Sequence, residues 1–484
     1  MTTNIFKTGL LTALAVAITF SSCKDEKPVT PPVVTPPVVE KEVILKGILG
    51  SMTLDSSKRY TISGTVTVDA GDTLIIPAGT KLFGQKSTKG TLVIKPGAMI
   101  IADGTPTHPI IFTSNQEIGA REQGDWGGLL ILGKANCNQN NPAIEGISPA
   151  ANYGTFNSSA NDNDNSGILR YVRIEYAGIA LTPNNETNSL TMGAVGSGTT
   201  IDFVQATYGG DDNFEWFGGT VYCKHLISYA AWDDDFDCDF GFSGKVQYAL
   251  AIRDPFNADQ SGSNGFEVDN DASGTTATPK TAAVFSNVTI LGPVYDSAKA
   301  SFSGNYQHAM HLRRNCELSI FNSVIAGFPI GLNLDGTLAN YTSDLGVLEN
   351  NILVCSAVKG TTTRPYFNGK SASTAVGDYF TKTKNNVAYT LSTPTSGTPA
   401  FSKALSDAGI NAELMMGYNT TSGASGNYPK DPNFSTFTGA TQTGASFSNA
   451  KVSTWFESTT HKGAFGSNDW TNVWSNFNPQ TEVY

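Results

Sequence analysis

The stretch from Tyr208 to Gly244 repeats itself after 22 residues, so that DDNFEWF at 211–217 falls on DDDFDCD at 233–239. A repeat of about 20 to 30 residues that is rich in β-forming side chains is typical of a β-solenoid, in which each repeat adds one rung. Because successive side chains of a strand point to opposite faces, we expect the aromatic residues of the repeat inside and its acidic residues outside.

The same alternation recurs in three later segments, which begin at Gly265, Ala309 and Gly331. If these segments are successive rungs, their outward residues form a ladder of the following pairs: Glu215 and Phe217, Asp237 and Asp239, Glu267 and Asp269, His311 and Arg313, Asn333 and Asp335. Adjacent rungs lie roughly 4.8 Å apart, and at that spacing unshielded carboxylates repel each other and shift each other's pKa values. We therefore expect a cation, a cationic partner or a shared proton at this ladder.

Short segments in which apolar and polar residues alternate, each bounded by Gly or Pro, recur throughout the middle of the chain. They predict one solenoid over residues 44–370. Phe214, Trp216, Phe236 and Phe266 are expected to stack inside it, because they occupy the inward positions of their segments.

The last part of the chain, residues 371–484, differs from the solenoid. No stretch before residue 400 shows sustained helical periodicity, and Phe401–Met416, followed by Gly417, is the best helix candidate. A solenoid needs its open end covered, which favours an irregular C-terminal cap that contains a short helix. The Trp residues after residue 454 leave a second interpretation open, in which they form an aromatic platform for sugar rings.

Residues 1–22 have the pattern of a targeting segment, with Lys7 before an apolar run at 9–20 that is too short to span a bilayer. Small residues precede Cys23 in a pattern that resembles a bacterial lipobox, so we expect cleavage before Cys23 and lipidation of its thiol. An ordinary secretory signal with an incidental cysteine is the alternative. Residues 23–43 would then be the lipidated cysteine and a Pro-rich linker, which favours extended polyproline II structure.

Several segments together resemble one known family: GDWGG at 124–128, LRYVRIEYAG at 169–178, the acidic repeat, and GSNGFE at 262–267. They are similar to Bacteroidota outer-membrane surface lipoproteins with a right-handed parallel β-helix of the pectin-lyase-like kind, over residues 44–484. The resemblance implies that all-β fold, a lipid-anchored place on the cell surface and an accessory role beside a TonB-dependent receptor in nutrient uptake. The activity of that family is largely unassigned.

The charge balance and the cysteines limit the partners and the chemistry. The chain carries 31 Lys and Arg against 42 Asp and Glu, a net charge of −11, which argues against nucleic acid and anionic lipid surfaces as partners. The cysteines after Cys23 are odd in number and have no metal-binding spacing. We expect buried free thiols, with a disulfide as the alternative, at these positions: Cys137, Cys223, Cys238, Cys316 and Cys355.

Two acidic segments are candidate calcium sites. Asp162 and Asp164 belong to DNDNSG, which matches the first half of a calcium loop, although the twelfth position is Arg173 and not Glu. The second candidate combines the two copies of the acidic turn, whose carboxylates stacked rungs would bring together: Asp211, Asp212, Asp233, Asp234 and Asp235. A solvated polar loop and a solvated acidic turn are the respective alternatives.

The acidic ladder is compatible with two functions. A site that binds a ligand or partner, a carbohydrate among the candidates, would use these residues: Asp211, Asp212, Glu215, Asp237, Asp239, Glu267 and Asp269. A polysaccharide lyase or glycoside hydrolase would move protons at a sugar ring with these residues: Asp233, Asp234, Asp237, His311 and Arg313.

We favour the binding protein, because the Gly-His-Gly and Arg-x-Lys motifs of polygalacturonases are absent. A purely structural subunit of an outer-membrane complex is a third interpretation. His308 and His311 are three residues apart, and a regular strand would place them on opposite faces, so their spacing is not evidence for a zinc site.

Overall fold

The computed structural model describes residues 42–484, except for 145, 149, 183–184, 295–301, 356–357, 360–361, 364–366, 370–372, 390–399 and 420–427. Residues Glu40–Tyr484 form one compact unit. The predicted targeting segment, Cys23 and nearly all of the predicted linker lie outside the described residues.

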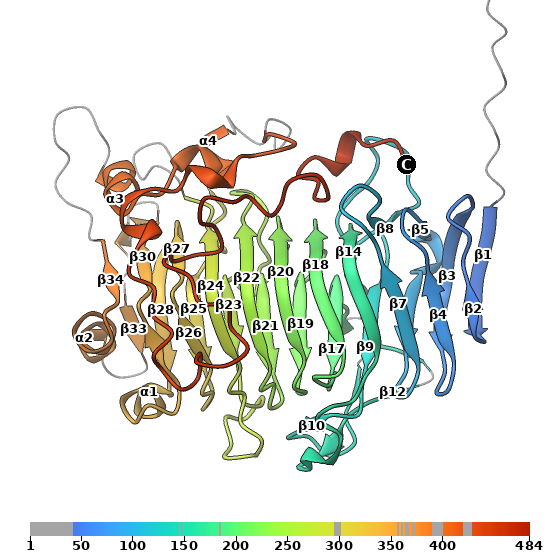
Figure 1. Cartoon of the computed structure of the whole chain (residues 1–484), viewed down its shortest axis with the longest axis horizontal. Helices are drawn as coiled ribbons and strands as arrows, with labels where there is room; N and C mark the ends of the chain where they lie inside the picture. The colour runs from blue at the N-terminus through green and yellow to red at the C-terminus, as the bar shows by residue number, and fades with distance from the viewer. Residues whose placement is uncertain are drawn as a thin grey trace, which may run out of the picture. The chain divides into compact units, whose positions relative to one another are not determined.

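The compact unit is a right-handed parallel β-helix, as predicted (Figure 1). Its main sheet has 26 strands. Each rung of the middle part consists of a long, bent strand and a short strand, and each strand pairs in parallel with the equivalent strand of the next rung. The two halves of the bent strands and the short strands form three lines of paired strands, which we call the first, second and third face.

The first face contains these strands: β2(Met52–Thr53), β4(Thr73–Ile76), β7(Met99–Asp103), the first halves of β14(Gly167–Glu175), β18(Thr200–Thr207), β20(Tyr222–Tyr229), β22(Lys245–Ile252) and β24(Val284–Leu291), then β26(Ser319–Phe321) and β29(Leu348–Glu349). The second face contains the first halves of β1(Glu42–Leu49) and β3(Arg59–Val68), β5(Lys81–Gly84), β8(Ile110–Ser114), the second halves of β14 to β24, β27(Val324–Ala326), β30(Ile352–Val354) and β34(Val387–Ala388).

The third face carries the acidic repeat. It contains the second halves of β1 and β3, β6(Thr91–Ile94), β9(Gly128–Leu132), β17(Leu190–Gly193), β19(Phe214–Phe217), β21(Phe236–Asp239), β23(Phe266–Val268), β25(His308–Arg313), β28(Ile330–Asp335) and β33(Phe367–Gly369). Short two-stranded pairs lie in the loops. One is parallel, β10(Asn136–Cys137) with β13(Thr155–Phe156), and three are antiparallel: β11(Ala143–Ile144) with β12(Ala151–Asn152), β15(Ala180–Thr182) with β16(Asn185–Glu186), and β31(Val358–Lys359) with β32(Thr362–Thr363).

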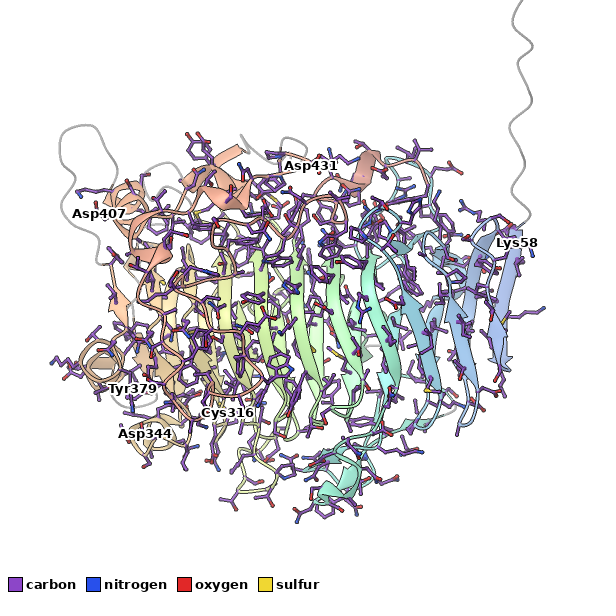
Figure 2. All side chains as sticks on the ribbon, in the orientation of Figure 1. Lys58, Cys316, Asp344, Tyr379, Asp407 and Asp431 are labelled. Atoms are coloured by element: carbon purple, nitrogen blue, oxygen red, sulfur yellow. The ribbon has the colours of Figure 1, made fainter. Side chains whose placement is uncertain are left out.

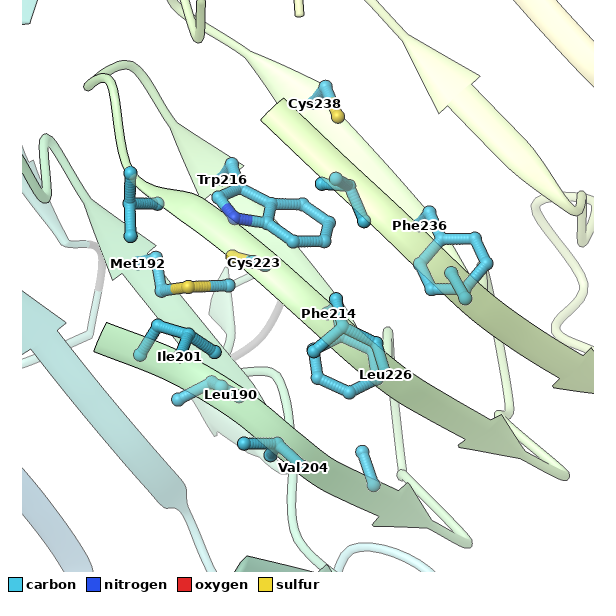
Figure 3. Close-up of a cluster of buried hydrophobic side chains, with 14 of the residues drawn as sticks. Leu190, Met192, Ile201, Val204, Phe214, Trp216, Cys223, Leu226, Phe236 and Cys238 are labelled. Carbon is cyan, nitrogen blue, oxygen red and sulfur yellow. The ribbon is translucent and has the colours of Figure 1, made fainter. Parts of the chain in front are cut away.

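The register of the third face confirms the 22-residue repeat. Phe214 pairs with Phe236 and Trp216 with Cys238, and all four side chains are fully buried inside the solenoid (Figure 3). The ring centroids of Phe214 and Phe236 are 6.0 Å apart, and Phe266 of the next rung lies 5.4 Å from Phe236. The interior is therefore a continuous apolar stack, which is what burial of the inward side chains of each rung favours.

A single left-handed residue bends each long strand between the first and second faces. Four of these residues, Tyr171, Phe203, His225 and Tyr248, have φ between 50° and 62° and carry rings that stack on one another. Asn287 and the Asn residues of later rungs take over the same position. Asn tolerates a left-handed backbone better than most residues do. At the aromatic residues, the stacking of their rings along the solenoid offsets the conformational cost of the left-handed backbone.

The helical content was predicted only in part. Phe401–Met416 was predicted as one helix, and this is wrong: α3(Ala400–Ala408) ends at Gly409, whose φ is 82°, and η3(Ala412–Leu414) and α4(Met416–Asn419) follow. Among the described residues, the other helices are α1(Leu338–Thr342), α2(Ser373–Thr383), η1(Lys86–Thr88), η2(Ser159–Asn161), η5(Phe434–Thr436), η6(Gly439–Gln442) and η7(Pro479–Thr481). The prediction missed α2, which packs Val376, Tyr379 and Phe380 into the core at the last rungs. The hydroxyl of Tyr379, labelled in Figure 2, accepts from the Leu348 amide at 3.2 Å.

Residues 428–484 run back along the side of the solenoid instead of covering its end (Figure 1). Their backbone is held by amide side chains of three different rungs: Asn322 donates to Ser446 O at 3.0 Å, Gln247 to Glu457 O at 2.8 Å and Gln205 to Asn476 O at 2.8 Å. The region predicted as a cap thus has two parts, α2 beside the last rungs and a long strap over the side.

The five cysteines after Cys23 are all buried and free, which confirms the prediction of buried thiols. Among the described residues, no helix is long and apolar enough to cross a membrane.

Candidate cation-binding site

The third face places carboxylates of successive rungs next to each other on its outer side. Glu215 of β19 pairs in register with Asp237 of β21, and Asp237 pairs with Glu267 of β23. The predicted ladder is therefore confirmed, since Glu267 in turn pairs with His311 of β25.

The two acidic turns that precede β19 and β21 also stack on each other. The amide of Asp234 donates to Asp212 Oδ1 at 2.7 Å, and the amide of Asp233 donates to Asp211 O at 3.3 Å. The carboxylates of one turn therefore lie beside the equivalent carboxylates of the next turn, at the edge of the third face.

The turns and the ladder line one cavity of about 330 Å³, which we call the acidic pocket. Its acidic lining consists of Glu186, Asp211, Asp212, Glu215, Asp233, Asp234, Asp237 and Glu267. Its apolar wall comes from the insertion that carries Ile144 and Tyr153, and from Phe217 and Phe240, whose rings stack at 5.5 Å. The insertion partly buries the acidic ladder, which the repeat alone would leave in solvent.

The pocket lacks positive charge on its lining. Of the described residues, no Lys, Arg or His is among those that line it. Basic residues begin at its edge, where His311 Nδ1 lies 3.3 Å from Glu267 Oε2 and Arg313 pairs with both Glu267 and Asp269. Glu267 therefore has basic partners, whereas no ion pair of the described residues involves Asp237 or Glu215.

Burial and mutual repulsion change the acidity of the pocket. Burial, with the neighbouring carboxylates adding to it, raises the pKa well above the ordinary value for these residues: Asp211, Asp212, Glu215, Asp234 and Asp237. Burial and the charge of Glu267 raise the pKa of Asp233 to about 7. Burial would also raise the pKa of Glu267, but His311 and Arg313 outweigh it and lower that pKa.

The carboxylates are close enough to share one ion. Three groups have ligand oxygens within 4.8 Å of one another: Asp211 with Asp212 and Asp233, Asp212 with Glu215 and Asp237, and Asp234 with Asp237 and Glu267. Two buried oxygens in the lining, Asp233 Oδ1 and Asn188 Oδ1, have no hydrogen-bond partner among the described residues. A set of carboxylate and amide oxygens suits a hard cation such as calcium.

The comparison with family models decides the family. The model described as "Pectate-lyase like beta helix domain" matches residues 47–399. The chain belongs to the pectate-lyase-like β-helix family. Comparison with curated proteins and with solved structures found no match. Family membership supports the fold and leaves the activity of this pectate-lyase-like β-helix open.

Five predicted ligand residues lie outside the acidic pocket of this pectate-lyase-like β-helix: Asp162, Asp164, Asp235, Asp239 and Asp269. Asp235 turns away from it and lies 3.2 Å from buried Arg253. Asp239 Oδ1 accepts from the Phe240 amide at 2.6 Å. Asp162 and Asp164 accept from the amides of residues 136 and 134, so their carboxylates brace a loop and do not join the other acidic residues.

The remaining predicted residues, His311, Arg313 and Asp269, form the neutralised end of the ladder. Arg313 Nε donates to Asp269 Oδ1 at 2.9 Å and Arg314 to Asp269 Oδ2 at 2.8 Å. The expectation that His308 and His311 face opposite sides is wrong, because their rings are 4.4 Å apart. Both Ala309 and Met310 belong to the buried core, so the regular alternation is broken at the start of β25.

Sequence reasoning missed several residues of the pocket in this family member. Asn188, which donates to Glu215, precedes β17 in the previous rung, and Tyr153 belongs to the insertion. Asn188 could have been found by extending the ladder one rung backwards, since β17 pairs with β19. No local sequence signal indicates that the insertion folds over the third face.

Proposed function

We propose that this chain is a binding protein that holds a divalent cation, calcium, in the acidic pocket. The observation that carries this proposal is the division of the ladder: Glu267 and Asp269 have basic partners, whereas no ion pair of the described residues involves Asp212, Glu215 or Asp237. Burying several carboxylates without compensation is unfavourable, and a bound cation removes that cost.

The apolar wall of the pocket supports the same function. Tyr153, Phe217 and Phe240 exclude part of the solvent from the carboxylates, which strengthens the attraction for a cation. A cationic group of a ligand could satisfy the same carboxylates in place of calcium, and the pocket volume of about 330 Å³ has room for such a group.

We propose further that the protein acts at the outer surface of the outer membrane, held there by the lipidated Cys23 and a Pro-rich stalk, as an accessory of a TonB-dependent receptor. This part rests on the sequence before residue 44 and on the resemblance to surface lipoproteins of Bacteroidota.

The test of the cation site is thermal unfolding of the chain with calcium or with a chelator. A ligand that binds only the folded state stabilises it by about 2.7 kcal/mol at a hundredfold excess over its Kd. We expect calcium to raise Tm of the wild type, and Asp233→Asn/Asp234→Asn to lose that rise. The matched control is Asp162→Asn/Asp164→Asn, which should keep it. If calcium leaves the wild-type melt unchanged, the cation site is refuted.

The alternative function is a polysaccharide lyase or glycoside hydrolase that uses the same carboxylates. It is favoured by the pair of Asp234 and Glu267, whose environments shift their pKa values in opposite directions, as acid and base roles require. Incubation with polysaccharides should then release new reducing ends or unsaturated products, and Asp234→Asn should abolish the release. No product from a broad substrate panel would refute the enzyme and leave the binding protein.

A further inference from the structure

A second cavity, of about 380 Å³, lies at the turns that also supply the acidic pocket. The turn before β19 gives Tyr208 to this cavity and Asp211 and Asp212 to the pocket, and the turn before β21 gives Trp232 to the cavity and Asp233 to the pocket. Its volume is within the range of small-molecule sites, roughly 300 to 1,000 Å³. Neither the family match nor the cation site explains it.

Aromatic rings form much of the lining of this second cavity. Phe256 is 39% exposed, so its ring is accessible to a ligand. Trp232 is held in one orientation, because its indole N–H donates to Asp259 Oδ1 at 2.8 Å. Tyr176 and Tyr208 stack with their planes 8° apart and their centroids 5.6 Å apart. The accessible rings of Trp232 and Phe256 suit the C–H face of a sugar ring, and the Tyr176 and Tyr208 rings lie behind them.

The cavity also contains a buried polar group that points to a ligand with hydroxyl groups. Tyr176 is fully buried, it lines the cavity, and its hydroxyl has no hydrogen-bond partner among the residues that the structure places. A buried hydroxyl without a partner costs free energy, so a native site normally supplies one. Gln123 and Asp254 add an amide and a carboxylate to the lining, which can donate to and accept from hydroxyls.

The charges around the cavity favour a neutral ligand. Arg121 is occupied, since it donates to the carbonyls of Pro479 and Glu482 and lies 4.7 Å from the centre of the Tyr484 ring. Glu122 Oε2 lies 2.9 Å from Lys86 Nζ, and Asp254 Oδ1 accepts from the Phe256 amide at 2.9 Å. The charged groups among the described lining residues therefore already have partners, which favours a neutral sugar over an acidic sugar or a phosphate.

The loop that carries Phe256 is already fixed in place. Asn257 Nδ2 donates to Ala230 O at 2.9 Å and to Ala231 O at 3.1 Å, which ties the loop to the turn before Trp232. The Tyr306 hydroxyl lies 2.5 Å from the carbonyls of Asp254 and Asn257. A preformed site loses little conformational entropy when a ligand binds.

We propose that this second cavity binds a neutral saccharide. The sugar rings stack on Trp232 and Phe256, and one sugar hydroxyl forms a hydrogen bond with the Tyr176 hydroxyl. The site is separate from the proposed cation site, so saccharide binding should persist when calcium is removed.

The experiment is calorimetric titration of the full chain, in the presence of a chelator, with hexasaccharides of four neutral polymers: cellulose, xylan, mannan and starch. We expect saturable binding of at least one of them. Phe256→Ala and Trp232→Ala should each weaken it about tenfold or more, and Tyr176→Phe, which removes one oxygen, should weaken it severalfold. Phe156→Ala is the matched control, because Phe156 is an exposed aromatic residue of another loop, and it should change nothing.

Two results would overturn the proposal. One is the absence of saturable binding of any of the four hexasaccharides to the wild type. The other is binding that Phe256→Ala and Trp232→Ala leave unchanged, which would place the sugar elsewhere on the molecule. Thermal unfolding of each variant shows whether it is folded. If Trp232→Ala does not fold, Phe256→Ala still tests the site, because Phe256 is exposed and its removal should not unfold the protein. Loss of the calcium response alone would refute the cation site and not this one.

Discussion

At the scale of the residue, equivalent positions of one ladder have opposite electrostatic surroundings. Asp237 and Glu267 are paired in register, yet Glu267 forms ion pairs with His311 and Arg313, whereas burial and acidic neighbours have the largest effects on the pKa of Asp237. Position in the repeat therefore determines where a carboxylate lies, and the residue one rung further determines whether it is neutralised. The candidate site is where the repeat lacks a basic residue.

This imbalance predicts how stability depends on pH in the absence of calcium. The pKa of Asp233 rises from an ordinary value of about 4 to about 7, and its buried neighbours shift in the same direction. The folded state then binds more protons than the unfolded chain, so its free energy of unfolding should fall as pH rises from about 4 to above 7.

Urea unfolding at several pH values, in a chelator, measures this dependence. Other groups titrate as well, so the informative quantity is the difference between the wild type and Asp233→Asn/Asp234→Asn. The wild type should lose more stability than the variant across that range, and calcium should restore it. If the free energy of unfolding of the variant changes with pH as that of the wild type does, protonation of these two carboxylates does not affect stability.

At the scale of the element, stability comes from the stack of rungs. Phe236 of β21 contacts Phe214, Phe266 and Phe285 of neighbouring strands and is fully buried. Phe236→Ala should therefore lower the free energy of unfolding by about 3 to 5 kcal/mol, through lost burial and the cavity that remains. Chemical denaturation measures it, and Phe156→Ala, on an exposed aromatic residue, should cost below about 0.5 kcal/mol. Equal costs for the two variants would contradict the assigned interior.

The elements also show what a sequence can and cannot predict. The sequence predicts the pairing of Phe214 with Phe236, because both copies of the repeat have the same inward and outward pattern. That pairing also predicts the position of most residues of the acidic pocket. The wall around Tyr153 and the strap over residues 205–322 were not readable, because both depend on contacts between segments far apart in the chain. The expected helix at 401–416 failed at Gly409, where a left-handed residue ended it.

At the scale of the whole molecule, we expect the β-helix to be held at a membrane by lipid on Cys23. Cys23→Ala should move the protein from the outer-membrane fraction to the soluble fraction, because lipid then no longer anchors the stalk. Cell fractionation with immunoblotting measures this, and Cys137→Ala, on a buried thiol, is the control that should stay in the membrane fraction. A Cys23→Ala protein that remains in the outer membrane would refute the anchor.

The most direct measurement of the central claim is a crystal structure of this chain grown with calcium. We expect one ion in the acidic pocket, bound by oxygens of Asp212 and Asp237 and by neighbouring groups at about 2.3 to 2.6 Å. An acidic pocket that holds only water at saturating calcium, or an ion found at Asp162 and Asp164 instead, would contradict the cation site.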